Sequence, residues 1–252
     1  MNVIQSGLPP TVCRMATITK NCHGCGVRLR LQLPKGASTR QFAERLPVLC
    51  DACAAAADRA EKDRELQERR EAAEAMCGLP SSLRGLAWEE MDDDGARSQP
   101  IEAARRWAAG ELNGLVLGGP CGTGKTRLAA TALWDRVQHG RRTRWVSVAR
   151  LVAMDRAGFG TDEKAQANRI LTGASPIILD DLDKVGTNAA VRALLYLAID
   201  NRIEAGAPLL VTTNLKPDQL AETFGEAISS RLRGDCEVHL LTGIDRRVAS
   251  AA

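Results

Sequence analysis

The chain has 252 residues and a formal net charge of +3; 44% of its residues are hydrophobic but only 3% are aromatic. This length suits one large domain with a small module, packed by Leu, Ala, Val and Ile. No apolar run approaches the ~20 residues of a membrane span, and residues 1–20 lack the apolar stretch of a signal peptide. Composition thus excludes a membrane protein, and we expect a cytoplasmic location.

Residues 1–20 are expected to form a flexible N-terminus, and residues 21–54 contain two C-x-x-C pairs. In a reducing compartment, paired cysteines indicate metal ligands before disulfides. Four thiolates on two tight turns close a tetrahedral Zn²⁺ site; redox thiols are the alternative. The sequence predicts a zinc-binding module, similar to a zinc ribbon, over residues 21–54. Its ligands would be Cys22, Cys25, Cys50 and Cys53.

The partner of this module is left open by its residues. Four basic side chains between the pairs would allow contact with nucleic acid: Arg28, Arg30, Lys35 and Arg40. The few aromatic residues exclude an extensive base-stacking platform.

Residues 55–79 form a highly charged segment with the composition of a helix. Asp58 and Lys62 are spaced i,i+4, as are Glu65 and Arg69, and such pairs support a helix. Its apolar residues are mostly alanine, so the helix has little to bury. We expect a solvated connector that ends near Pro80.

From residue 80 to residue 252, predicted strands alternate with predicted helices. The strands cover residues 114–117, 143–148, 176–180, 208–213 and 236–241. The helices cover residues 125–139, 149–157, 162–171, 188–205 and 217–224. This alternation predicts an α/β domain whose five-stranded parallel sheet lies between helices.

The segment GPCGTGKT fits the phosphate-binding pattern G-x-x-x-x-G-K-[ST] and stands between a predicted strand and a predicted helix. Its glycines let backbone N–H groups face the phosphates of ATP, at a helix N-terminus that favours anions. The lysine would neutralise the β- and γ-phosphates, and the threonine would offer its hydroxyl to Mg²⁺. The segment consists of Gly119, Pro120, Cys121, Gly122, Thr123, Gly124, Lys125 and Thr126.

Two acidic residues, Asp180 and Asp181, end the apolar run of the third predicted strand. In open α/β sheets the carboxyl ends of strands meet the ligand. Asp180 is predicted to hold Mg²⁺, and Asp181 to orient and deprotonate the attacking water. Asn214, after the fourth strand, could bind that water or the γ-phosphate, although an Asn there is also a common turn former.

These elements, with the segment VTTNLKPDQLAETFGEAISSRL, resemble the DnaC and IstB branch of AAA+ ATPases over residues 80–247. The resemblance implies an AAA+ P-loop fold, with Asn214 as sensor I and Arg231 as an arginine finger that acts on a neighbouring subunit. An ordinary surface arginine is the alternative for Arg231. The family's usual Glu is Asp181 here, which suggests a slow nucleotide switch.

The C-terminal residues leave no room for a full helical lid, so the lid is expected to be reduced or absent. A sensor II arginine would then be Arg246 or Arg247; a charged tail is the competing explanation.

The resemblance implies an ATPase that loads a hexameric replicative DNA helicase onto single-stranded DNA and forms an ATP-dependent homo-oligomer. ATP, Mg²⁺ and Zn²⁺ would be its cofactors, and the zinc module would contact the helicase. Two alternatives stay open. One is an IstB-like transposition helper that assembles on duplex DNA, and the other is a nucleotide-gated adaptor for DNA or protein with little hydrolysis.

Overall fold

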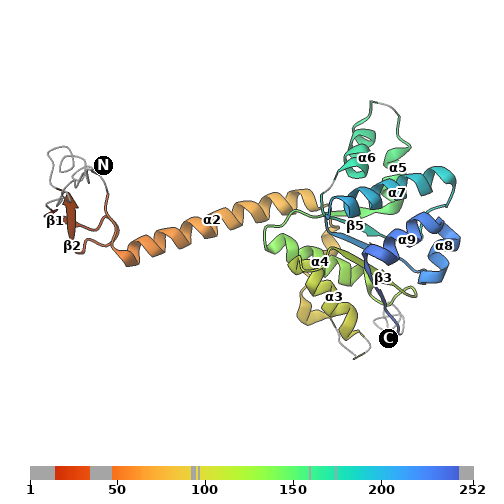
Figure 1. Ribbon diagram of the computed structural model, residues 1–252, viewed down its shortest axis with the longest axis horizontal. Coiled ribbons are helices and arrows are strands. Elements are labelled where there is room, and N and C mark those ends of the chain that lie inside the picture. Colours follow the sequence, from red (N-terminus) through yellow and green to blue (C-terminus); the bar gives the residue numbers. More distant parts are fainter. Residues whose placement is uncertain are drawn as a thin grey trace, which may run out of the picture. The chain divides into compact units, whose positions relative to one another are not determined.

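The structure, a computed structural model, describes residues 15–34, 47–91, 95, 97–158, 160–173 and 175–243 (Figure 1). The chain divides into two compact units, Met1–Glu65 and Leu66–Ala252. In the described part of the chain, no helix is long and apolar enough to cross a membrane.

The first unit contains an antiparallel hairpin and the start of a long helix. Strand β1 (Met15–Asn21) pairs with β2 (Arg28–Pro34), and the turn between them carries the first cysteine pair. The part of the expected flexible N-terminus from Met15 onward is therefore a strand. Helix α2 (Asp51–Cys77) begins inside the second cysteine pair, so that pair lies at a helix start rather than on the second tight turn we predicted.

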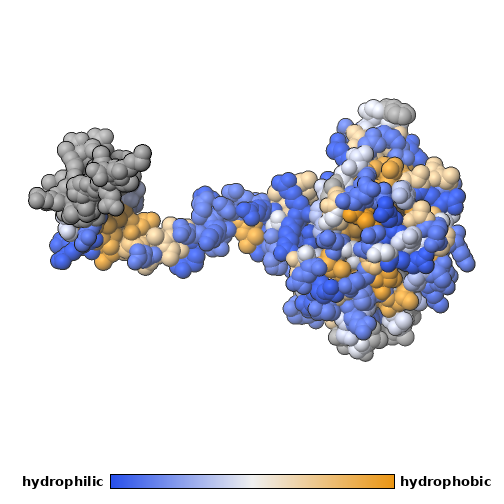
Figure 2. Space-filling model, in the orientation of Figure 1, coloured by the Kyte–Doolittle hydropathy of each residue, from blue (hydrophilic) through white to orange (hydrophobic). Residues whose placement is uncertain are grey.

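Helix α2 confirms the predicted helix but corrects its role. Figure 2 shows that its surface is largely hydrophilic beyond the alanine run near its start. In its last turns, however, Ala73 and Cys77 are fully buried, and Leu79 follows them into the same core. Small side chains allow close helix packing, so a segment rich in alanine here joins a core that its composition did not predict. The second unit thus begins before residue 80.

The sheet of the second unit has five strands, and all its pairings are parallel. Its strands are β3 (Gly114–Gly118), β4 (Arg144–Ser147), β5 (Ile177–Asp180), β6 (Leu209–Thr212) and β7 (Glu237–Leu240). They lie in the order β4-β5-β6-β3-β7, and all five predicted strands are confirmed. Because β3 lies between β6 and β7, the segment after β3 is next to the ends of strands that are distant in sequence.

Helices cover both faces of the sheet (Figure 1). They are α3 (Ser98–Ala109), α4 (Lys125–Gln138), α5 (Val148–Asp155), α6 (Asp162–Thr172), α7 (Ala189–Glu204), α8 (Pro217–Phe224) and α9 (Glu226–Asp235). Two short 3-10 turns, Ser81–Leu83 and Trp88–Glu90, precede α3. The sequence did not predict α3 or α9.

Each face of the sheet has its own hydrophobic core. Alternate residues of β5 point to opposite faces: Ile177 and Leu179 enter the core with α5 to α9, while Ile178 enters the core with α3, α4 and the end of α2. All three side chains are at most 1% exposed. A strand apolar on both faces is typical of a central parallel strand, and it fixes the polar residues that follow β5 at the edge of the sheet.

Candidate functional site: a nucleotide cavity and a cysteine cluster

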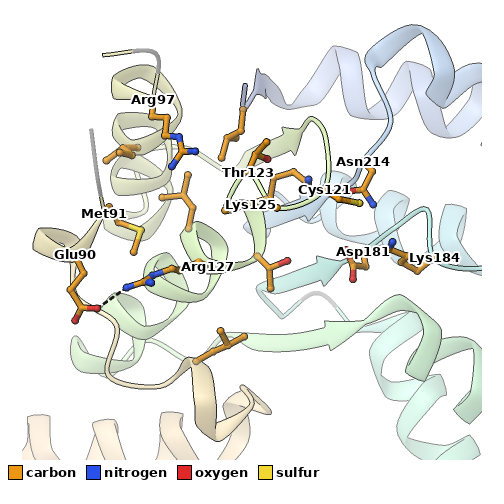
Figure 3. Close-up of a pocket in the computed structure, with 17 residues that line it drawn as sticks. Glu90, Met91, Arg97, Cys121, Thr123, Lys125, Arg127, Asp181, Lys184 and Asn214 are labelled. Atoms are coloured by element: carbon orange, nitrogen blue, oxygen red, sulfur yellow. Dashed lines mark hydrogen bonds and ion pairs between the residues drawn. The ribbon is translucent and has the colours of Figure 1, made fainter. Parts of the chain in front are cut away.

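A cavity of about 450 Å³ lies at the carboxyl edge of the sheet, over the segment that joins β3 to α4. It brings together residues from the phosphate-loop motif, from the turn after β5 and from the turn after β6 (Figure 3). Asp181, Lys184 and Asn214 lie near the loop at one side of the cavity, and Arg97 and Met91 line the other side. Three predicted segments of the site therefore meet in one place.

The loop wraps the start of α4 in a conformation that depends on glycine. Gly119 has φ 129° and Gly124 has φ 94°, both in the region that side chains disfavour. A Cβ on Gly119 would also collide with the carbonyl oxygen of Leu241. The first N–H groups of α4 have no partner inside the helix, so this helix start presents donors to the cavity.

Lys125 is the first residue of α4 and is only 5% exposed. Its Nζ donates to the carbonyl oxygens of Gly119 and Pro120, both at 2.7 Å. Burial lowers the pKa of Lys125, while the neighbouring Cys121 and Asp183 oppose that shift. The ammonium group is thus held at the base of the loop, where it can bind phosphate oxygens.

Thr126 and Asp180 form an oxygen pair suited to a small cation. The Oγ1 of Thr126 donates to Oδ1 of Asp180 at 3.2 Å, and the Oγ1 of Thr212 donates to the same oxygen at 2.7 Å. Burial raises the pKa of Asp180, against the effect of those hydrogen bonds. Adjacent ligands of octahedral Mg²⁺ lie about 2.9 Å apart for bonds of 2.0–2.1 Å. The two residues therefore fit the Mg²⁺ site predicted for them, and the cation would keep Asp180 ionised.

Asp181 has an unusual backbone for its residue type. Its φ is 58°, a left-handed conformation that Asp tolerates better than most residues. Its amide donates to Oγ1 of Thr212 at 2.9 Å, which fixes the turn. The chain thus bends sharply at the end of β5, and Asp181 lines the cavity beside Lys184 (Figure 3).

The structure reveals a further residue, Asp183, that the sequence analysis did not single out. Its carboxylate accepts from the backbone N (2.7 Å) and Nδ2 (2.8 Å) of Asn214 and from Oγ1 of Thr213 (3.0 Å). Burial would raise the pKa of Asp183, but these hydrogen bonds lower it overall. Asp183 therefore holds Asn214 in place, acting on the site through that side chain.

The other wall of the cavity also escaped prediction. It contains the apolar residues Leu83, Met91, Ile101, Leu128 and Leu241, a surface that could hold the flat face of a purine base. Arg97 also lines the cavity and is only 6% exposed. These residues come from the turns before α3, from α3 and α4 and from the end of β7, and no local motif marks them.

Arg231 lies on α9 and does not line the cavity of its own chain. Its Nη2 is 2.8 Å from Oδ1 of Asp200 on α7. A hydrogen bond with Tyr196, followed by the charge of Asp200, raises the pKa of Arg231. Its side chain is 37% exposed. Arg231 is thus oriented by α7 at an accessible surface, whereas Arg246 and Arg247 lie outside the described residues.

The four cysteines of the two pairs form one cluster in the first unit. Their Sγ atoms all lie within 4.8 Å of one another, and Cys25 and Cys50 are 3.7 Å apart. A tetrahedron of sulfurs about 2.3 Å from zinc has edges of about 3.8 Å. The amides of Cys50 and Gly24 donate to Sγ of Cys22, at 3.3 and 3.4 Å. Mainly through the first of these, the pKa of Cys22 falls to about 6, whereas hydrogen bonds with the other cysteines, Cys25 first, raise the pKa of Cys53 to about 12. The cluster fits Zn²⁺.

Comparison with known proteins identifies the family. The sequence profile of IstB-like ATP-binding proteins matches residues 67–243. The chain belongs to the IstB-like family of ATP-binding proteins. It is 34% identical, over 119 residues, to a Mycobacterium tuberculosis protein described as an ATP-binding protein in an insertion sequence, with 46% of each chain covered. It is 22% identical, over 141 residues, to the chromosomal replication initiator DnaA of a Caulobacter strain, covering 55% of this chain and 28% of that one. The chain thus spans less than half of either relative.

Solved structures show the same fold as this IstB-like chain. DnaI matches with a TM-score of 0.60 at 23% identity, covering 71% of this chain and 100% of that one. The DnaC helicase loader matches with a TM-score of 0.56 at 21% identity, covering 65% of this chain and 100% of that one. At this identity the likeness concerns the fold, which is the P-loop AAA+ fold expected from the motifs.

Proposed function

We propose that this IstB-like protein hydrolyses ATP and uses the cycle to load a replicative DNA helicase onto single-stranded DNA. The observation that carries the ATPase part is the meeting of the phosphate loop, Asp181 and Asn214 at one cavity, with Asp180 hydrogen-bonded to Thr126 of that loop. Their types and positions correspond to phosphate binding, cation binding and orientation of water.

Each residue has a defined task in this proposal. Lys125 and the loop amides bind the phosphates, and Thr126 and Asp180 hold Mg²⁺, which when bound neutralises phosphate charge. Asp181 orients the attacking water and takes its proton. Asn214, held by Asp183, binds that water or the γ-phosphate.

Arg231 would complete the site of a second copy of the chain. Its guanidinium is partly exposed and does not line its own cavity, so it could donate to the site of a neighbouring subunit. A fixed guanidinium stabilises the charge of the transferring phosphoryl group. ATP hydrolysis would then require assembly of several copies of the chain. The ion pair with Asp200 of the same chain would orient the guanidinium of Arg231.

The choice of a helicase as the partner is supported by the fold shared with DnaI and the DnaC helicase loader. A second candidate, a helper of a transposase on duplex DNA, is favoured by the family and by the relative in an insertion sequence. An adaptor that binds ATP without turnover is the third. The helicase loader and the transposition helper differ in their partner and not in their ATP site.

Co-elution with the host's hexameric replicative helicase tests the loader proposal. The full chain is compared, with ATP, with a chain that begins at Leu66, the first residue of the second unit; a start at Pro80 would remove Ala73 and Cys77 from the core. We expect a complex with the full chain alone, because the first unit would contact the helicase. Absence of any complex, together with ATP-dependent binding to the transposase, would favour the transposition helper instead.

A further inference from the structure

The positive charge of the protein is concentrated in its N-terminal part. Residues 1–53 contain seven Lys or Arg residues and two acidic residues, whereas residues 54–252 contain 27 Lys or Arg and 29 acidic residues. If the cysteine cluster holds Zn²⁺, four thiolates and the ion together contribute a formal charge of −2. The N-terminal segment stays net positive even then, so it attracts polyanions more strongly than the remainder does.

The β1–β2 hairpin presents this charge on one face. Side chains alternate along both strands, and one face consists of six exposed polar residues: Thr17, Thr19, Asn21, Arg28, Arg30 and Gln32. The register places Arg28 opposite Asn21, and Arg30 opposite Thr19. We call these six residues the polar hairpin face.

All six side chains of the polar hairpin face can donate hydrogen bonds, and none is acidic. Residues 15–34 contain no Asp or Glu at all. Among the described residues, no acidic side chain forms an ion pair with Arg28 or Arg30. Two neighbouring guanidinium groups are therefore available on a surface of hydrogen-bond donors.

We propose that the polar hairpin face is a docking surface for the phosphate backbone of duplex DNA. A protein partner is less suitable, because protein interfaces rely on apolar and aromatic anchors and this face has none. Interfaces with DNA are polar and strongly positive, and most of their hydrogen bonds go to phosphate and sugar oxygens.

The polar hairpin face carries no aromatic residue, which favours duplex over single-stranded DNA. Single-strand binders stack bases on aromatic side chains, and the described residues of the first unit contain no Phe, Tyr or Trp. The major groove of B-DNA, about 12 Å wide, admits a two-stranded β-ribbon. The major groove of double-stranded RNA, by contrast, is too narrow and deep for side chains to read. A hairpin with an arginine-bearing face suits the wider groove and its flanking phosphates.

The proposed contact of the polar hairpin face with duplex DNA is a separate property from helicase loading and does not depend on it. The test uses the full-length, zinc-loaded protein without nucleotide, so that ATP-driven assembly does not contribute. Anisotropy of a labelled duplex and of a matching single strand is measured between about 50 and 200 mM salt. The double variant Arg28→Ala/Arg30→Ala is compared with Arg59→Ala/Lys62→Ala, which removes two exposed charges from α2 in the same unit.

We expect the hairpin variant to bind the duplex about tenfold or more weakly at low salt. The slope of log affinity against log salt should become shallower by roughly 0.9 for each lost phosphate contact. The α2 variant should match the wild type, and Arg28→Lys/Arg30→Lys should keep most of the affinity, because lysine also binds phosphate. Zinc content, measured in each sample, shows whether the module is intact.

Equal duplex affinity and salt slope in the wild type and the hairpin variant would overturn the proposal. Tighter binding of the single strand than of the duplex, through the same arginines, would also overturn it. A third contrary result would be that these arginines bind an acidic protein partner and not DNA. The loader proposal could fail in its co-elution test while this result stands, because no helicase is present here.

Discussion

Replacing Lys125 with alanine is expected to abolish ATP hydrolysis and to weaken ATP binding more than any other single change in the cavity. Lys125 brings a positive charge to the base of the loop, where it is buried and held between two carbonyl oxygens. Removing one preorganised group that stabilises phosphate charge costs about 10²–10³-fold in rate. Binding of a fluorescent ATP analogue and release of phosphate are the measurements.

A matched control for this change is Lys164→Ala. Lys164 is half-buried and donates to Asp155, but it lies on α6, outside the cavity. This variant should bind ATP as the wild type does. Hydrolysis by Lys125→Ala at the wild-type rate would contradict the assignment of the cavity. Undiminished partner binding by Lys125→Ala, without any effect of ATP, would favour the adaptor alternative.

Removal of zinc is expected to unfold the first unit and to leave the second unit folded. The apparent free energy of zinc binding to small structural sites is about 10–16 kcal/mol, more than a short hairpin can supply by itself. A chelator, or the variant Cys25→Ser, should therefore make residues 1–50 sensitive to protease. ATP binding should persist, because the cysteines lie in the other unit from the cavity.

Zinc content by metal analysis provides the direct readout. Loss of a ligand should weaken zinc binding by more than the roughly 10–100-fold that loss of an outer-shell partner costs. Cys121→Ser, which alters an exposed cysteine of the second unit, should keep the zinc. A wild-type protein that purifies without zinc, or a Cys25→Ser protein with full zinc content, would contradict the zinc assignment.

The sheet was predictable because its strands are short, apolar runs separated by helices of ordinary length. For Ile177, Ile178 and Leu179, burial on both faces follows from the absence of polar residues in the run. Helix α9 was missed because only Gly225 separates it from α8 and its sequence is mostly polar. Tertiary packing of Ile228 and Leu232, rather than a strong local pattern, accounts for it.

The phosphate loop was predictable from a local motif, but the contacts between its neighbours were not. Asp183 and Asn214 are 31 positions apart and meet because β5 and β6 are adjacent in the sheet. Strand order is not encoded in either segment alone. For the same reason no local motif marks Arg97 or the apolar wall of the cavity, whose residues come from separate turns, from helices and from the end of a strand.

Burial of the end of α2 could not be predicted from its sequence either. Alanine contributes little to a hydrophobic pattern, so Ala73 carried no signal in a charged helix. Its environment is decided by residues that pack around it, including Leu79 and Trp107.

Mixing two inactive variants tests most directly the claim that the ATP site is completed by a second copy of the chain. Lys125→Ala retains Arg231 but has a defective cavity, and Arg231→Ala retains the cavity but lacks the finger. Arg233→Ala, on the same helix and paired with Glu226, is the matched control and should hydrolyse ATP normally. The account predicts little phosphate release from either inactive variant alone and a partial return of activity in the mixture. Full activity of Arg231→Ala alone, or no activity in the mixture under conditions where the wild type assembles and hydrolyses ATP, would contradict it.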